Sequence, residues 1–154
     1  MLIPVWQRIL GIIIYFLPWS DAIPFGTNLF QQLPYLKWLI IPAWPFLIIE
    51  NVIPFGGLLM FLLLFLAVVR NPKVPYFIRF NTLQALLTDI TIVILGYAFQ
   101  ILVRPFGVNL MTRTLSNTVM VGILAIVIFA IIECFQGKEP DLPGISGAVR
   151  SQLF

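Results

Sequence analysis

The sequence has no histidine, a single cysteine and few charged residues. Without histidine, a Ser-His or Cys-His nucleophile pair and an imidazole metal site are both excluded. The one cysteine, Cys134, cannot form an internal disulfide, and its place in an apolar run is typical of a small packing residue. The chain also lacks a phosphate-binding loop, a dinucleotide fingerprint and any run of Lys or Arg. These absences predict a protein that is not an enzyme, has no cofactor and binds no nucleic acid.

Apolar side chains make up most of what is present. Of the 154 residues, 60% are hydrophobic and 10% are charged, and the mean hydropathy is +1.03. A soluble domain carries roughly 25% charged residues. The composition therefore predicts an all-α, polytopic membrane protein. Each span needs about 20 apolar residues, which leaves room for four or five spans and none for a separate soluble domain.

Four apolar runs predict the spans of one membrane domain that covers residues 1–154. The spans are expected at residues 5–17, 52–69, 80–103 and 118–135. Pro18, Ser20 and Asp21 predict the end of the first span. Residues 21–32 are then expected to form a loop.

The segment of residues 33–49 is ambiguous, because it is apolar but rich in proline. Proline costs about 3 kcal/mol in a helix interior. The segment carries three prolines, and its two tryptophans suit a membrane interface. We expect a broken helix that lies along the membrane surface or dips into it, and a full span is the alternative. The residues concerned are Pro34, Pro42, Pro45, Trp38 and Trp44.

The end of the chain predicts a capped helix followed by a polar tail. Ser116 or Asn117 is the expected N-cap of the last span. Residues 136–154 are predicted to form a polar, turn-rich tail. Within it, residues 144–147 match the Gly-x-Ser-Gly string of rhomboid-type intramembrane proteases. No histidine is available as a base, so we expect a turn there.

Basic residues predict the orientation of the four spans in the membrane. One side would hold the N-terminus, the 70–79 connection and the tail, and the other side would hold fewer basic residues. Both termini are therefore expected on the cytoplasmic side, or on the stromal side in a plastid. The first group is Arg8, Arg70, Lys73, Arg79, Lys138 and Arg150, and the second is Lys37, Arg104 and Arg113.

The third span carries a polar face. Successive members are three, four and three residues apart, which places them on one side of a helix, with Asp89 on the flank at mid-membrane depth. An ionisable group at that depth faces protein or water, not lipid. The face could line a conduit or contact a translocating chain, or it could hold the bundle together by hydrogen bonds between helices. Its residues are Asn81, Gln84, Thr88, Asp89 and Thr91.

The connection that carries Arg70, Lys73 and Arg79 has a simpler explanation. Positive-inside topology or binding of anionic lipid accounts for its charge, and a functional contact is the alternative. Glu133 is a candidate ion-pair partner of Arg79 or Arg8.

Several strings resemble a known family. They are IPFGG at residues 53–57, VRNP at 69–72 and FIRFNTLQALLTDI at 77–90, with YFLP at 15–18 and PDLPGIS at 140–146. Together they resemble the twenty-kilodalton subunit of the chloroplast inner-envelope translocon, the Tic complex, and its cyanobacterial relatives. The resemblance covers essentially the whole chain, and its signature positions here are Arg70, Asn71, Arg79, Phe80, Asn81, Gln84 and Asp89.

The resemblance implies four membrane helices, stromal termini, no known cofactor and a proposed role in a protein-conducting channel. Thr88 departs from the aliphatic residue expected at its position. Plant members carry a transit peptide and none is evident here, so we expect a cyanobacterial or plastid-encoded member. The expected locations are the plastid inner envelope or a cyanobacterial membrane.

These observations lead to one main hypothesis and two rivals. The main one is a translocon subunit that contributes to a protein-conducting channel, with membrane lipid, other subunits or further copies of itself, and a translocating polypeptide as partners. A small scaffold or assembly factor without a conduit is the first rival. A small-solute carrier is the second, although four spans without an internal repeat are few for that class.

Overall fold

A computed structural model describes residues 2–153, and within that range every regular element is a helix and none is a strand, as predicted. Twelve helical elements follow one another along the described chain. The elements are α1 Val5–Ile14, α2 Phe16–Ala22, η1 Ile23–Gly26, α3 Thr27–Gln32, η2 Pro34–Ala43, α4 Trp44–Val52, α5 Gly56–Leu64, η3 Phe65–Val69, α6 Tyr76–Leu102, η4 Arg104–Phe106, α7 Leu110–Phe135 and α8 Ile145–Leu153. Of the η segments, η3 is π-helical and the other three are 3₁₀ helices.

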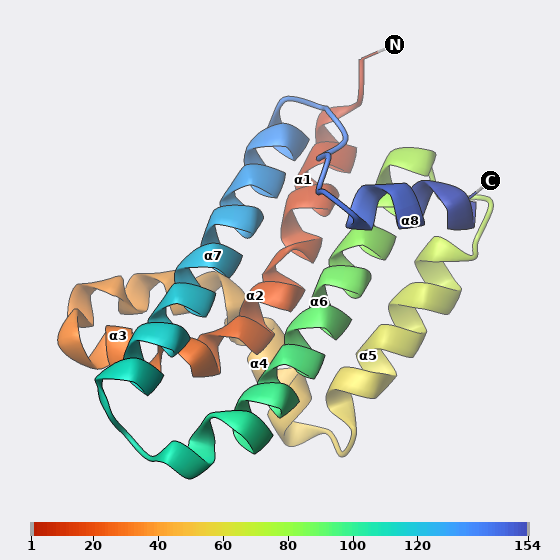
Figure 1. The fold of residues 1–154 in the computed structure, drawn as a ribbon. Coiled ribbons are helices and arrows are strands. Elements are labelled where there is room, and N and C mark those ends of the chain that lie inside the picture. Colours follow the sequence, from red (N-terminus) through yellow and green to blue (C-terminus); the bar gives the residue numbers. More distant parts are fainter. Residues whose placement is uncertain (1, 154) are drawn as a thin grey trace.

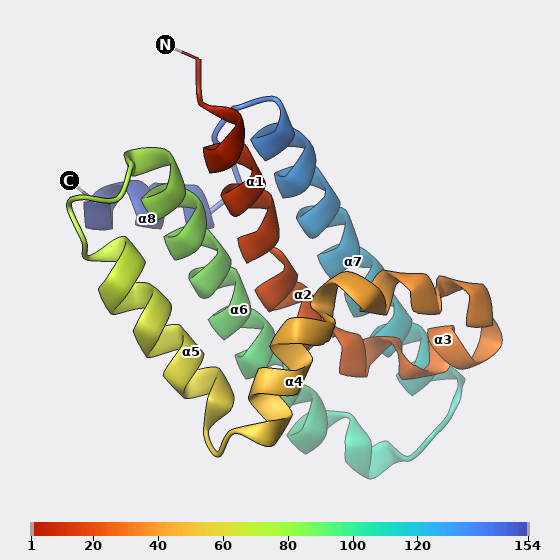
Figure 2. The same ribbon diagram turned by 180° about the vertical axis from the view of Figure 1, so that it is seen from behind.

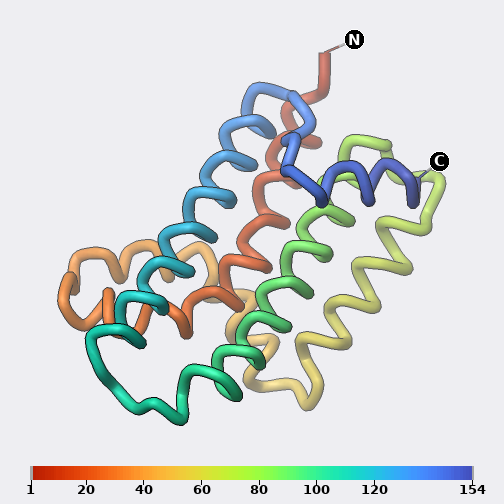
Figure 3. Tube along the Cα trace, in the orientation of Figure 1, coloured from red at the N-terminus to blue at the C-terminus, as the bar shows by residue number. Residues whose placement is uncertain are grey.

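The long helices lie side by side in the order α7, α1–α2, α6 and α5 (Figures 1 and 2). Helix α6 packs against α1, α2, η3 and α8, whereas α7 packs against α1, α2, η1 and α3. The N-terminal helix therefore separates the two longest helices over much of their length. The path of the chain brings the N-terminal end, the 70–75 connection and α8 to one end of the bundle (Figure 3).

Among the described residues, three helical segments are long and apolar enough to cross a membrane: Val5–Gln32, Tyr76–Phe106 and Leu110–Phe135. The second predicted span is different, because α5 and η3 together hold only 14 residues, or about 21 Å at 1.5 Å per residue. They form a bent pair with the Pro34–Val52 segment, and the two halves meet at 115°. Counting this pair as one broken span gives four spans.

The proline-rich segment is a broken helix, as predicted. Residues 34–43 form the 3₁₀ helix η2, and α4 follows with Pro45 at its second position. Proline lacks the N–H donor that a continuous α-helix needs, and it is tolerated in a first turn where no intrahelical acceptor is required. The position of this segment at the membrane surface stays a prediction.

The predicted loop over residues 21–32 is wrong, because the chain stays helical there. Pro18 is the third residue of α2, where a missing N–H costs little. The Ser20 hydroxyl donates to the carbonyl of Leu17 in its own helix, at 2.6 Å, so it does not end the helix. Phe25 is buried, and its ring meets Phe99 edge to face at 5.4 Å. This packing overrides the weak local breaking signals.

The predicted cap of the last span is also wrong, since α7 begins eight residues before residue 118. Asn109 is the N-cap and forms a capping box with Thr112, each side chain accepting from the other's backbone N–H at 2.9 and 3.0 Å. The Ser116 hydroxyl donates instead to the carbonyl of Phe25 and ties α7 to η1. Similarly, α6 begins at Tyr76, directly after Pro75 and four residues before the predicted span.

The tail contains a helix where only turns were expected. Gly144 adopts a left-handed φ of +78° just before α8, and Ser146 lies within the helix. Arg150 of α8 lies 3.8 Å from Glu139 and 3.6 Å from Asp141, and its guanidinium lies over the Phe80 ring at 5.6 Å. These are the ion pairs among residues 2–153, so the expected pairing of Glu133 is not formed. The Arg8 side chain donates instead to the carbonyl groups of Ile3 and Phe135.

We predict that the 70–75 connection and the tail face one side of the membrane, and the 107–109 connection the other. Single cysteines at Asn71, Gly144 and Gly107, placed in a Cys134→Ala chain, should be labelled by a membrane-impermeant thiol reagent in that pattern. The Cys134→Ala chain alone is the unlabelled control. Labelling of Asn71→Cys from the same side as Gly107→Cys would contradict the arrangement of helices in the membrane.

Candidate functional site

The predicted polar face of α6 is divided between two surroundings. Asn81 and Gln84 lie in the half of α6 nearest the chain termini and are fully buried. Asp89 lies at the middle of this 27-residue helix and is also buried. Thr91 is exposed. The residues therefore share a helix but do not form one continuous lining within a single chain.

Asn81 and Gln84 join α6 to the first helix through Tyr15. The Tyr15 hydroxyl donates to Oδ1 of Asn81 at 3.1 Å and accepts from Nε2 of Gln84 at 3.1 Å. Asn81 also donates to the carbonyl of Phe77 at 2.8 Å, and the thiol of Cys134 on α7 donates to Oδ1 of Asn81 at 3.1 Å. Every polar atom named here has a partner, as a buried polar network requires.

The same network holds the tail against the bundle. Gln84 donates to the carbonyl of Pro140 at 2.9 Å, and its Oε1 accepts from the Ser146 hydroxyl at 2.7 Å. Ser146 in turn accepts from the backbone N–H of Leu142 at 2.7 Å. The sequence interpretation missed Ser146 as a partner of α6. The sequence did contain a signal for this contact, because the tail string at residues 140–146 and the α6 string at residues 77–90 both belong to the family resemblance.

The two threonines of the predicted face bond to their own helix. Thr88 donates to the carbonyl of Gln84 and Thr91 to that of Leu87, each at 2.8 Å. Such bonds satisfy a hydroxyl without contacting another helix. Neither Thr88 nor Thr91 therefore takes part in the hydrogen-bond network around the side chains of Asn81 and Gln84.

Asp89 faces two other acidic side chains. Its carboxyl group is hydrogen-bonded to that of Asp21 on α2, and Asp21 is in turn hydrogen-bonded to Glu50 on α4. Ser20 donates to Glu50 at 3.2 Å, whereas Oδ1 of Asp89 is buried without a hydrogen-bond partner. The sequence interpretation used Asp21 only as a helix-ending residue and joined neither Asp21 nor Glu50 to Asp89, because each lies far from Asp89 along the chain. No set of three acidic or thiol groups in residues 2–153 has the geometry to hold a metal ion.

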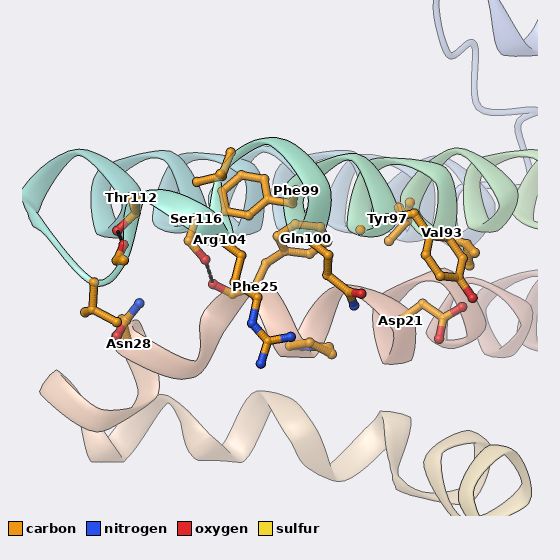
Figure 4. Close-up of a pocket in the computed structure, with 16 residues that line it drawn as sticks. Asp21, Phe25, Asn28, Val93, Tyr97, Phe99, Gln100, Arg104, Thr112 and Ser116 are labelled. Carbon is orange, nitrogen blue, oxygen red and sulfur yellow. Dashed lines mark hydrogen bonds between the residues drawn. The ribbon is translucent and has the colours of Figure 1, made fainter.

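A cavity of about 850 Å³ extends from this acidic group toward the far end of the bundle. It lies between η1 and α3 on one side and the second half of α6, η4 and the start of α7 on the other. Asp21 and Tyr97 lie at one end, Asn28 and Thr112 lie at the other, and Arg104 lies between them (Figure 4). Ile92 and Val93, one turn after Asp89, form part of its wall. A mostly apolar cavity with a few convergent polar groups is the usual form of a binding site.

The remaining signature residues hold the connection before α6. The Asn71 side chain accepts from the backbone N–H of Lys73 at 3.0 Å, which forms a tight turn. Arg79 donates to the carbonyl of Val69 at 2.8 Å at the end of η3. Phe80 is fully buried, and Arg70 is exposed beside Arg79. Asn71, Arg79 and Phe80 thus have structural contacts that account for them without a ligand.

Comparison with known proteins gives a match over nearly the whole chain. Residues 4–149 match the family described as "Chloroplast import apparatus Tic20-like". A "Tic20 family protein" of Synechocystis sp. is 38% identical over 148 residues, which cover 96% of this chain and 92% of that protein. "Protein TIC 20-v, chloroplastic" of Arabidopsis thaliana is 32% identical, covering 96% and 71%. "Tic20 family protein Ycf60" of Gracilaria tenuistipitata var. liui is 30% identical, covering 98% and 77%.

We predict that Gln84→Leu loosens the tail and destabilises the bundle. The change leaves the buried hydroxyl groups of Tyr15 and Ser146 short of a partner, which costs about 1–3 kcal/mol. Denaturant unfolding of the detergent-solubilised chain and protease cleavage within residues 136–144 should both report it. Thr91→Val on the same helix is the matched control, because Thr91 is exposed and bonds only to its own helix. Equal stability of the two variants would contradict the role of the network.

We predict that Asp89→Asn does not lower stability or assembly in the resting protein. The amide keeps the size of the side chain and can still donate a hydrogen bond to a neighbouring carboxyl group. Asp89→Leu should be less stable than Asp89→Asn, because it removes a hydrogen-bond partner of Asp21. Thermal unfolding and native-gel mobility would measure both effects. A clear loss of stability in Asp89→Asn would show instead that a cation of the resting assembly is paired with Asp89.

Proposed function

The chain belongs to the Tic20-like family of the chloroplast import apparatus, and on that premise we propose that it is a membrane-embedded translocon subunit that forms part of a protein-conducting path. The observation that carries the proposal is the cavity beside the second half of α6. It runs from the centre of the bundle to the end opposite the termini, as the path of an arriving polypeptide would. The family is not an enzyme family, in agreement with the sequence interpretation.

Two features of the cavity suit an extended polypeptide. Its walls combine apolar groups such as Ile92 and Phe99 with side-chain hydroxyl and amide groups such as Tyr97 and Gln100. A passing chain presents both apolar side chains and backbone groups without hydrogen-bond partners. A wall with both apolar and polar groups can contact the former and hydrogen-bond the latter, which lipid cannot do. A volume of about 850 Å³ accommodates a short stretch of residues at a time.

The two halves of α6 would then have different tasks. The side chains of Asn81 and Gln84 are hydrogen-bonded within the bundle and would hold it together. Their partners are Tyr15, Pro140 and Ser146. None of the five predicted lining residues lines the cavity, but Asp89 lies one helical turn before two residues that do, Ile92 and Val93, and we propose it for the conduit. The buried network also supports the scaffold hypothesis, because Asn81 and Gln84 of the polar face bond to other parts of the same bundle.

A complete conduit needs further walls. Large apolar side chains of α5, such as Leu59 and Leu63, are exposed and would face lipid or another subunit. We propose that other translocon subunits or further copies of this chain complete the path. The location follows the family, in the plastid inner envelope or a cyanobacterial membrane. Both termini would face the stroma or cytoplasm, where the basic end of the bundle satisfies the positive-inside rule.

The proposal predicts that a polypeptide stalled in transit crosslinks to the cavity wall. A photo-crosslinking amino acid at Gln100 lines the cavity, whereas the same group at Ile101 projects from the exposed apolar surface. A precursor fused to a tightly folded domain would stall part-way across membranes that contain the full-length chain. Crosslinks should form from Gln100 and not from Ile101.

The crosslinking pattern distinguishes the conduit hypothesis from the scaffold hypothesis. Crosslinks from neither position, in membranes where the precursor is shown to stall, would favour a scaffold without a conduit. Equal crosslinking from both positions would place the polypeptide outside the cavity, against the lipid-facing surface.

A further inference from the structure

We propose that the basic end of the bundle holds a binding site for one anionic phospholipid, with the phosphate group of the lipid bound between η3, α6 and α8. This end carries the 70–75 connection and α8 (Figure 3). The cavity of the proposed function runs from the centre of the bundle toward the opposite end. A lipid bound at the basic end would therefore be independent of any polypeptide in that cavity.

A second, smaller cavity of about 200 Å³ lies where these three elements meet. Helix α6 packs against both η3 and α8, and α8 crosses the start of α6 and ends beside the 70–75 connection (Figures 1 and 2). The volume equals roughly that of six water molecules at about 30 Å³ each, which suits a phosphate group and not a segment of another protein. Two arginines and a glutamine line it together with apolar side chains such as Phe65 and Val69. The polar lining residues are Arg70, Arg79 and Gln152.

The local backbone fixes the guanidinium group of Arg79 at this cavity. Nε of Arg79 donates to the carbonyl of Val69 at 2.8 Å, at the last residue of the π-helical segment η3. At the same turn the backbone N–H of Arg70 donates to the carbonyl of Phe65, five residues earlier, at 2.9 Å. Such π-helical turns are rare and often occur at functional sites. The bond to Val69 uses one of the five N–H donors of Arg79, so it accounts for the position of the side chain and leaves the two Nη groups for an anion.

The two arginines of this cavity have no acidic partner among residues 2–153. Both ion pairs in that range belong to Arg150, which lies beside Glu139 and Asp141. Arg70 is exposed, and its side chain forms no hydrogen bond within the same range. Two guanidinium groups at one small cavity repel each other, and an anion between them would remove that cost. Phosphate fits the requirement, because its oxygens accept two parallel hydrogen bonds from one guanidinium group.

The surface beside the cavity favours the headgroup of a lipid over a soluble phosphate. Leu62 and Leu66 are 43% and 63% exposed. Each lies three residues before a lining residue, Phe65 or Val69, and residues three apart are neighbours on the surface of a helix. An apolar strip therefore leads from the cavity along α5, where acyl chains could lie while the phosphate contacts the arginines. Basic pockets between membrane helices on the cytoplasmic side are a usual place for anionic headgroups.

The test measures which lipid the full-length chain retains in detergent, by native mass spectrometry. Phosphatidylglycerol and phosphatidylcholine with identical acyl chains are added in equal amounts, so that only the headgroup differs. The chain should retain one phosphatidylglycerol molecule with a preference of about tenfold, because the choline cation of the other lipid would lie beside two guanidinium groups. Equal retention of the two lipids would refute the site.

Two substitutions at exposed side chains then locate the retained lipid. Arg70→Gln should lower the retention of phosphatidylglycerol about tenfold, because it removes a charge-assisted contact. Gln152→Glu should also lower it, because the new carboxylate pairs with the arginines and repels the phosphate. Lys73→Gln is the matched control, since it removes the same charge from the same connection but does not line the cavity. In a buffer of physiological ionic strength this control should change retention by less than about twofold.

Every other result contradicts a defined part of the proposal. Equal losses in Arg70→Gln and Lys73→Gln would show attraction to the basic surface as a whole, without a site. Full retention in both Arg70→Gln and Gln152→Glu would place the lipid elsewhere on the chain. Displacement of the lipid by inorganic phosphate at the same concentration would make a soluble anion the ligand. Thermal unfolding without lipid checks that the variants fold, and if Arg70→Gln does not, Gln152→Glu decides.

Discussion

The bundle depends on one buried hydrogen-bond network, in which Gln84 of α6 meets Tyr15, Pro140 and Ser146. In an apolar interior a polar group without a partner costs several times what a satisfied one contributes. Gln84 can satisfy its donors and acceptor only if the first helix and the tail are both in place. A single side chain therefore couples three parts of the sequence that would otherwise be held by non-directional apolar packing.

This constraint divides α6 into a closed half and an open half. In the closed half, Asn81 and Gln84 are satisfied by the chain itself, and Arg79 and Asn71 fix the connection that precedes them. In the open half, the wall of a cavity replaces the packed interior. A rigid half that anchors a less packed half is a common arrangement for a binding site, because the anchor keeps the site in shape without filling it.

The group of Asp21, Glu50 and Asp89 lies at the boundary between these halves. The closed half satisfies its polar atoms internally, whereas this group keeps a buried oxygen without a partner. Natural proteins tolerate such a cost mainly where it serves a task.

The sequence by itself determined the all-helical membrane class, the approximate helical runs and the polar residues of α6, because composition and helical periodicity depend only on nearby residues. It did not determine that residues 21–32 stay helical, that Asn109 begins α7, or that Ser146 reaches Gln84. Nor did it join Asp21 and Glu50 to Asp89. Periodicity tells which residues share a face of one helix, but not which helix that face meets. The bonds from Gln84 to Tyr15 and Ser146 span 69 and 62 residues of sequence, so only the packing of whole helices could decide them.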